Sequence, residues 1–155
     1  MMLEPGDAIP AVTLMDMEGV EFALDHYSGK PLVVYFYPKA DTPGCTNEAK
    51  DFTALADEYA AAGVPVIGIS RDKPAKLKKF SEKYGLSVIL ASDEPGDACA
   101  AFGTWVEKSL YGRTYMGIER ATFLFGAQGK VQRIWRKVKV KGHAEEVLEA
   151  LREAA

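Results

Sequence analysis

Residues 32–45 read LVVYFYPKADTPGC, a run of six apolar and aromatic residues followed by a turn-rich segment that ends in a cysteine. The run is continuous and is bounded by a proline on each side, which is typical of a central β-strand covered on both faces. Apolar residues then recur at steps of three and four as far as Gly63, which predicts a helix that begins near Cys45. Cys45 is therefore expected between the end of a buried strand and the start of a helix.

Periodicity and turn residues outline the rest of the chain. Residues 12–24 alternate in polarity on either side of a turn at 16–19, which predicts an N-terminal β-hairpin. Residues 103–119 have no regular period and are expected to form an ordered surface loop that is placed to line a site. The other predicted elements are strands at 66–69 and 88–90, helices at 74–84, 97–102 and 143–152, and an antiparallel strand pair at 121–125 and 131–140.

This order of elements predicts an α/β fold. Strands and helices alternate first, and a hairpin and a closing helix follow, which favours a central mixed sheet flanked by helices on both faces. Together with the N-terminal β-hairpin, residues 1–155 are expected to form a single domain, because a chain of this length can bury about 68–70% of its unfolded surface. The sequence contains neither an internal repeat nor an interdomain linker.

Composition and charge exclude several classes of partner. Nineteen Lys and Arg residues against 22 Asp and Glu residues give a net charge of −3, so no nucleic acid is expected to bind. The longest stretch without a charge covers residues 59–70, whereas a membrane-spanning helix needs about 20 apolar residues. No membrane segment is therefore predicted. Residues 1–7 do not combine a basic region with an apolar run, so no export signal is predicted and a cytoplasmic location is expected.

Any cysteine chemistry must involve Cys45 or Cys99, the two cysteines of the chain. They are 54 residues apart, which matches no compact metal or dithiol motif. The two histidines, His26 and His143, show no metal-ligand spacing either. We therefore expect neither a metal nor another cofactor.

Cys45 stands where a thiolate is favoured over a thiol. The first turn of a helix offers N–H donors without intrahelical acceptors, together with the positive end of the helix dipole. Both stabilise a negatively charged sulfur, so Cys45 is expected to ionise easily. The ordinary alternative for a free cysteine is an inert buried thiol.

The spacing Pro-x-x-x-Thr-x-x-Cys, formed by Pro38, Thr42 and Cys45, resembles the active-site signature of the peroxiredoxins. The wider string YFYPKADTPGCTNE at 35–48 is similar to the bacterioferritin comigratory protein branch of that family, also called PrxQ. Further similar segments, which extend the resemblance over nearly the whole chain, are 92–94, 102–103, 107–108 and 117–120. The resemblance implies a thioredoxin-like fold and thiol-dependent reduction of hydrogen peroxide and organic hydroperoxides.

Carried over position by position, the resemblance makes Cys45 the peroxidatic cysteine and Thr42 a hydrogen-bonding partner of peroxide and thiolate. It makes Pro38 a shield for the pocket, and Arg120, just before the predicted strand at 121–125, the arginine that completes the site. A hydroxyl can donate and accept, and an arginine is a permanent cation with several directed donors, so both suit cleavage of an oxygen–oxygen bond. The resemblance also implies that no cofactor is bound, that thioredoxin or another thiol is the reductant, and that the protein is a monomer or weak homodimer.

One position departs from the pattern of the branch. Many members carry a resolving cysteine five residues after the peroxidatic one, where this chain has Lys50. Cys99 matches a cysteine that some relatives have in addition, and its apolar neighbours favour a packing role. We therefore favour a one-cysteine cycle in which an external thiol reduces a Cys45 sulfenic acid. An internal Cys45–Cys99 bond would require the loop and the first helix to rearrange.

Other interpretations of the same residues stay open at this point. Arg120 could be a structural ion-pair partner, Thr42 a helix N-cap, and Glu48 a residue that caps or charges the helix start. A general thiol–disulfide oxidoreductase is the nearest enzymatic alternative, but the chain lacks a Cys-x-x-Cys pair. A redox-responsive binding or chaperone-like module is the alternative from another class, and it would be oxidised stoichiometrically rather than turn over peroxide.

Overall fold

β3 (Leu32–Phe36) lies in the middle of the sheet, as the unbroken apolar run predicts. The computed structural model describes residues 3–154. Residues 1 and 2, which belong to the segment searched for an export signal, and residue 155 lie outside the described residues. All five residues of β3 are buried. The strand pairs in parallel with β4 (Val66–Ser70) and antiparallel with β8 (Ala121–Phe125), which explains why neither of its faces is polar.

In the described part of the chain, seven strands form one mixed sheet in the order β2-β1-β5-β4-β3-β8-β9. β5 (Ile89–Ser92) continues the parallel centre, and antiparallel strands flank this centre on both sides. The predicted N-terminal hairpin is present as β1 (Thr13–Met15) and β2 (Glu21–Ala23), and β9 (Val131–Trp135) pairs antiparallel with β8. The predicted α/β class with a central mixed sheet is confirmed.

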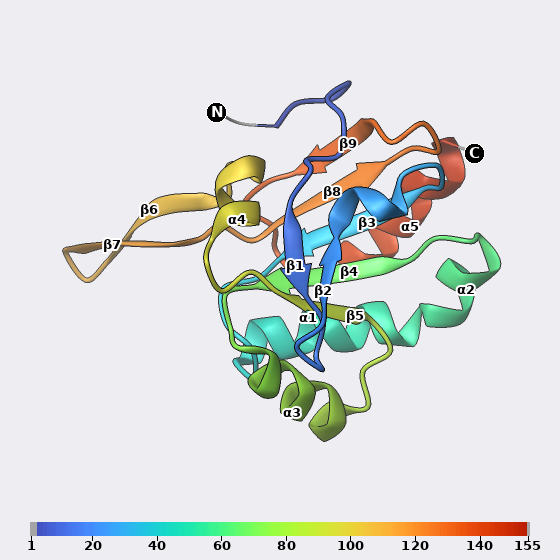
Figure 1. The fold of residues 1–155 in the computed structure, drawn as a ribbon. Coiled ribbons are helices and arrows are strands. Elements are labelled where there is room, and N and C mark those ends of the chain that lie inside the picture. Colours follow the sequence, from blue (N-terminus) through green and yellow to red (C-terminus); the bar gives the residue numbers. More distant parts are fainter. Residues whose placement is uncertain (1–2, 155) are drawn as a thin grey trace.

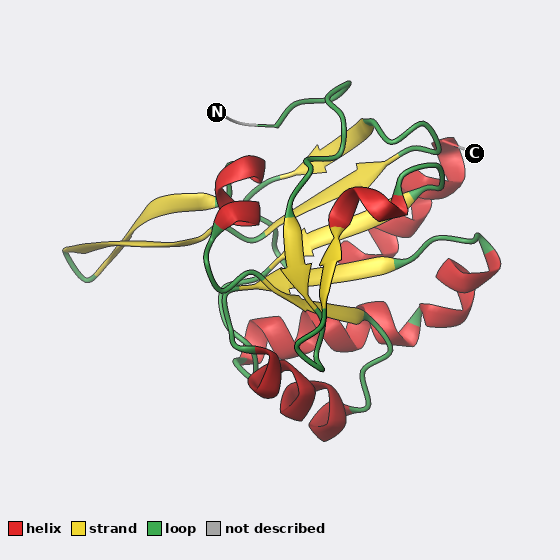
Figure 2. Ribbon diagram, in the orientation of Figure 1, coloured by secondary structure: helices red, strands yellow, loops and turns green. Residues whose placement is uncertain are grey.

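The two faces of the sheet are covered by different helices (Figures 1 and 2). Alternate residues of β3 enter two separate hydrophobic cores, with Val33 and Tyr35 on one side and Val34 and Phe36 on the other. The first core is closed by α1 (Pro43–Ala54), α2 (Ala56–Ala61), α3 (Pro74–Tyr84) and α5 (His143–Ala154). The second is closed by α4 (Asp97–Phe102) and the 3-10 helix η1 (Leu24–Tyr27). Within residues 3–154, every helix is too short or too polar to cross a bilayer.

The segment predicted as a surface loop is instead a second, two-stranded sheet. β6 (Trp105–Leu110) and β7 (Arg113–Ile118) pair antiparallel and project from the body of the molecule, on the left of Figure 1. The turn between them holds Tyr111 and Gly112 at φ of 51° and 76°, as a two-residue hairpin turn requires. The loop prediction was wrong because most of this arm is exposed, so no apolar period marks the strands.

Two of the predicted elements differ clearly from the structure in their extent. The helix expected from Cys45 to Gly63 begins two residues earlier, at Pro43, and is divided into α1 and α2 at Leu55. The strand expected at 131–140 ends at Trp135, because the backbone then turns so that the N–H of Val138 donates to the carbonyl of Arg120.

Gly68 provides room for the side chain that fills the first core. It lies opposite Tyr35 in the β3–β4 register, and an added Cβ would approach the Tyr35 ring to 2.6 Å. That ring stacks on Phe52 of α1 at 4.9 Å, so it cannot move aside freely. Gly68→Ala is therefore expected to lower the free energy of unfolding by about 1–3 kcal/mol, measured by urea denaturation.

Gly117→Ala is the matched control for this substitution. An added Cβ there would meet its nearest neighbours at 3.4 Å, an ordinary contact. Equal urea midpoints for Gly68→Ala and Gly117→Ala would contradict the packing argument.

Candidate active site

The register between β3 and β8 brings the two halves of the site together. Phe36 at the end of β3 pairs with Ala121 at the start of β8, so the residue before β8 faces the segment that follows β3. Arg120 is that residue, and the loop at 38–44 is that segment. The carbonyl of Arg120 also accepts the N–H of Val138, which fixes its backbone.

Cys45 lies in the first turn of α1, with 2% of its surface exposed. Thr42 has the extended backbone of an N-cap residue, and its carbonyl accepts the N–H of Thr46. Pro43 takes the first helical position, where a missing N–H has no cost. The amides of this turn have no acceptor within the helix, so they are available to a negative charge at the sulfur.

The guanidinium of Arg120 joins Cys45 to a buried carboxylate. Its Nη2 donates to Cys45 Sγ at 3.3 Å, and its Nη1 donates to Glu48 Oε1 at 2.7 Å. Gly44 permits this approach, because an added Cβ there would lie 3.2 Å from Arg120 Nη2. The site therefore aims a fixed cation at the sulfur.

The ion pair is buried unequally on its two sides. Glu48 has 1% of its side chain exposed and Arg120 has 17%. Burial raises the pKa of Glu48 to about 7, although the Arg120 cation opposes this change. The pKa of Arg120 is raised above its ordinary value in spite of burial, because Glu48 and Cys45 attract its charge. Glu48, which the sequence allowed as a mere cap, is thus an internal partner of the arginine.

The structure places the four predicted site residues around one loop, with different surroundings. Cys45 and Arg120 are in contact through the Nη2–Sγ hydrogen bond. The Thr42 hydroxyl donates to the carbonyl of Lys39 at 2.8 Å and makes no side-chain cap. Pro38 is exposed and forms part of the wall of a cleft. Thr42 occupies the N-cap position, but the hydroxyl cap that was left open as an alternative role does not form.

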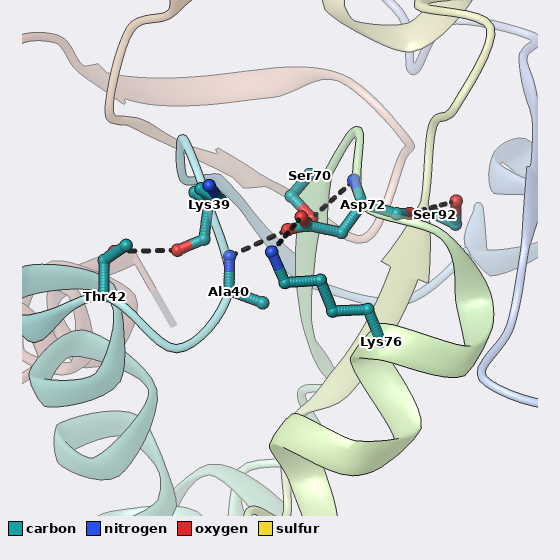
Figure 3. A network of polar contacts seen from close by, with 7 residues as sticks. All are labelled: Lys39, Ala40, Thr42, Ser70, Asp72, Lys76 and Ser92. Atoms are coloured by element: carbon teal, nitrogen blue, oxygen red, sulfur yellow. Dashed lines mark hydrogen bonds and ion pairs between the residues drawn. The ribbon is translucent and has the colours of Figure 1, made fainter.

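Asp72 anchors the loop from the other side, as Figure 3 shows. Its Oδ2 accepts the N–H of Ala40 at 2.7 Å and the hydroxyl of Ser70 at 2.9 Å, while Oδ1 pairs with Lys76 of α3 at 3.2 Å. The Ser92 hydroxyl donates to the Asp72 carbonyl at 2.6 Å, which holds Asp72 itself in place. Sequence analysis missed this residue, because Asp72 and Ala40 are 32 positions apart.

A second anchor joins the loop to the last turn of α3. Asp41 has φ of 62°, an unusual backbone conformation for a residue other than glycine. Its carboxylate accepts the Tyr84 hydroxyl at 2.6 Å and pairs with Lys83 at 3.0 Å. These two contacts lower the pKa of Asp41. Lys50 Nζ lies 5.7 Å from the centre of the Tyr84 ring, so this side chain packs against the anchor.

Cys99 belongs to the other core. It is buried in α4, on the opposite face of the sheet from Cys45, and both thiols are free. Its backbone N–H donates to the buried carboxylate of Asp93 at 2.8 Å, and burial raises the pKa of its thiol. These surroundings are those of a packing residue. Within residues 3–154, no group of three or more His, Cys, Asp or Glu side chains is placed to hold a metal ion.

A cleft of about 600 Å³ opens between the loop and the projecting hairpin. Pro38 and Lys39 form the wall on the side of the loop. Arg71 and Glu94 come from the segments after β4 and β5. The hairpin side consists of Trp105, Lys108, Tyr115, Met116, Gly117 and Ile118.

Comparison with protein families matches residues 5–134 to the AhpC/TSA family. The chain is 45% identical to peroxiredoxin Bcp of Escherichia coli K12 over 153 residues, which are 99% of this chain and 98% of that protein. It is 42% identical to peroxiredoxin Bcp of Bacillus subtilis, with the same coverage of both chains.

Solved structures give the same result. The bacterioferritin comigratory protein of Xanthomonas campestris, studied for its alkyl peroxide reduction, superposes with a TM-score of 0.88 at 43% identity, covering 96% of this chain and 99% of that one. A mutant of PrxQ from Xylella fastidiosa superposes with a TM-score of 0.93 at 36% identity, covering 99% and 98%. These neighbours confirm the predicted thioredoxin-like fold.

The buried carboxylate predicts a pH-dependent stability. Because the pKa of Glu48 is higher in the folded chain than its usual 4.5, the folded state holds a proton that the unfolded state has released between about pH 4.5 and pH 7. The stabilising contribution of the Glu48 proton to the free energy of unfolding is thus at its maximum below about pH 4.5 and is lost as the pH rises to about 7. The wild type is expected to lose roughly 3 kcal/mol relative to Glu48→Gln over this window, measured by urea denaturation at a series of pH values. Parallel pH profiles for the two proteins would refute the expectation.

Removal of the Asp72 anchor is expected to loosen the loop. Asp72→Ala leaves the buried N–H of Ala40 without its acceptor, which should lower the free energy of unfolding by about 1–3 kcal/mol. The amide hydrogen of Ala40 should exchange faster in Asp72→Ala than in the wild type, as measured by NMR. Asp72→Asn keeps a side-chain carbonyl and should retain most of the protection. If Asp72→Ala leaves exchange at Ala40 unchanged, the anchor has no such role.

Proposed function

Because the chain belongs to the AhpC/TSA family and is a thiol-dependent peroxidase of the peroxiredoxin Bcp type, we propose that Cys45 is the sulfur that attacks the peroxide. The observation that carries this proposal is the 3.3 Å hydrogen bond from Arg120 Nη2 to Cys45 Sγ, in the first turn of a helix. This contact places a permanent cation beside the sulfur, where it can stabilise the negative charge that takes part in nucleophilic attack.

In the first step the Cys45 thiolate attacks one oxygen of the hydroperoxide. A sulfur–oxygen bond forms and the oxygen–oxygen bond breaks, so the sulfur is oxidised by two electrons to a sulfenic acid. The other oxygen leaves with the electron pair and takes a proton, which yields water from hydrogen peroxide or an alcohol from an organic hydroperoxide. No electron carrier is needed for this step.

Arg120 has the geometry to stabilise the charge that moves from sulfur to the departing oxygen. Glu48 holds one side of the guanidinium at 2.7 Å, so the other side keeps its direction toward the sulfur. Donors that are fixed before the reaction need no reorganisation during it, and this is commonly the largest contribution to catalysis. The Thr42 hydroxyl, which donates to Lys39, retains acceptor lone pairs that can receive a hydrogen bond from the hydroperoxide.

The oxidised sulfur is reduced from outside in this proposal. Cys99 lies in the other core, across the sheet from Cys45, and Lys50 offers no thiol. A disulfide requires Cα atoms within about 7 Å, which the intervening sheet prevents without a rearrangement. These facts support the one-cysteine cycle, with thioredoxin or another thiol as the reductant.

The setting of the reaction follows from the same cycle. We place it in the cytoplasm, where reduced thiols are maintained. The substrates are hydrogen peroxide and organic hydroperoxides, and the protein works as a monomer or weak homodimer, as the resemblance to the PrxQ branch implies.

The test is peroxide consumption with excess dithiothreitol as the reductant. Cys45→Ser should abolish it, because a serine hydroxyl is not ionised at neutral pH, whereas Cys99→Ser should leave it nearly unchanged. After one equivalent of peroxide, trapping with dimedone and mass spectrometry should place the adduct on Cys45. Full activity of Cys45→Ser would refute the assignment, and a mass decrease of two hydrogens that joins both cysteines would replace the one-cysteine cycle with an internal bridge.

A further inference from the structure

The cleft beside the Cys45 loop carries positive charge that no carboxylate neutralises. Lys39, Arg71 and Lys108 line it, and among the described residues none of the three has a carboxylate within ion-pair distance. Glu94 is the acidic residue of the wall, but Arg71 donates to its backbone carbonyl, at 3.0 and 3.2 Å, rather than to its carboxylate. The cleft therefore has an excess of two positive charges.

The cleft adjoins both segments that form the site. On one side Lys39 directly follows Pro38 in the loop that leads to Cys45. On the hairpin side Ile118 stands two residues before Arg120, whose guanidinium contacts Cys45 Sγ. Lys108 is partly buried on this side, and its pKa is lowered by burial and by repulsion from Arg120, while Cys45 and Glu119 oppose that change.

The cleft also offers an apolar wall of modest size. Trp105 is 38% exposed and has the Arg71 guanidinium 4.6 Å from its ring centre, and the exposed side chains of Tyr115 and Met116 stand beside it. A volume of about 600 Å³ lies within the range of pockets that hold small molecules. Its occupant should combine a short apolar stretch with a negative group.

Charge decides which of the two reactants fits this description. Hydrogen peroxide and simple hydroperoxides are neutral and gain nothing from an excess of cations. A thiol reacts as its thiolate, so a positive cleft raises the local concentration of the reactive form and of any carboxylate it carries. Cys99 lies on the opposite face of the sheet from Cys45, so this second reactant must come from outside.

We infer that the cleft between the loop and the hairpin binds the reductant, and that this reductant is a small thiol bearing a carboxylate, which pairs with Lys108 and Lys39. The inference rests on the proposed function of Cys45. It narrows the electron donor from thiols in general to one chemical class.

The reaction in this cleft balances with two molecules of thiol. The thiolate of the first attacks the Cys45 sulfenic sulfur, a disulfide bond forms, the sulfur–oxygen bond breaks, and the oxygen leaves with protons as water. A second thiolate then attacks the sulfur of the bound reductant, which releases Cys45 as a thiolate. The two thiols are oxidised to one disulfide, and Cys45 is reduced by two electrons.

The test compares three small thiols of equal length and different charge: 3-mercaptopropionate, 2-mercaptoethanol and cysteamine. The Cys45 sulfenic acid is first generated with one equivalent of hydrogen peroxide and verified with dimedone, in a Cys99→Ser background. Formation of the mixed disulfide is then measured by rapid quenching and mass spectrometry. Each rate constant is expressed per thiolate and divided by the rate constant of the same thiolate with a small neutral disulfide, which removes differences in intrinsic nucleophilicity. We expect 3-mercaptopropionate to react about tenfold faster than cysteamine, with 2-mercaptoethanol between them, and the preference to shrink as salt is added.

Matched variants identify the source of that preference. Lys108→Glu should reduce the ratio of the 3-mercaptopropionate rate to the cysteamine rate to about one or below, and Lys108→Arg should retain it. Lys30→Glu changes the net charge equally but lies before β3, at the end of the strand opposite to Pro38, and should keep the wild-type ratio.

Three results would overturn the inference. The first is equal rates for the three thiols. The second is a loss of the charge preference in Lys30→Glu as large as that in Lys108→Glu. The third is a charge preference in the oxidation step, measured with anionic and neutral hydroperoxides, together with no charge preference in the reduction step. Failure of the dimedone trap would instead refute the proposed role of Cys45, so the two failures are distinct.

Discussion

The guanidinium of Arg120 lies between a buried carboxylate and a buried sulfur, and the rest of the site depends on that arrangement. A carboxylate as enclosed as that of Glu48 is costly unless it is paired, and a sulfur anion in a nearly closed position needs a cation beside it. One permanent cation meets both needs because its two terminal nitrogens point in different directions. The β3–β8 register and the small Gly44 both serve to place it.

The loop before α1 is held as firmly as the arginine. Asp72, two residues before α3 and paired with Lys76 of that helix, fixes the loop backbone, and Tyr84 and Lys83 at the end of α3 fix the carboxylate of Asp41. The loop is therefore supported near both ends of α3, which explains how Asp41 keeps a left-handed backbone conformation. Rigid support of this kind lets donors face a reacting atom before the reaction begins.

Much of the fold could be predicted from local patterns, and the exceptions share a cause. The strand at 32–36 is marked by a continuous apolar run, and the helix at 74–84 by apolar residues at helical spacing. Their burial follows directly from these local patterns. The hairpin at 105–118 is exposed on both faces and has no such period, so it was expected as a loop. The candidate residues of the site were identified from the resemblance to the peroxiredoxins, whereas the Asp72 anchor depends on a contact between distant segments that no local pattern reveals.

The sheet separates Cys45 from Cys99, so oxidation of one leaves the other out of reach. A sulfenic acid with no thiol beside it is open to a second peroxide, which converts it to a sulfinic acid that ordinary thiols do not reduce. In the proposed one-cysteine cycle, the number of turnovers of each molecule is therefore set by the relative rates at which a thiol and a second peroxide react with the sulfenic acid. Such a cycle suits the steady removal of peroxide at low concentration better than a sudden rise in its concentration.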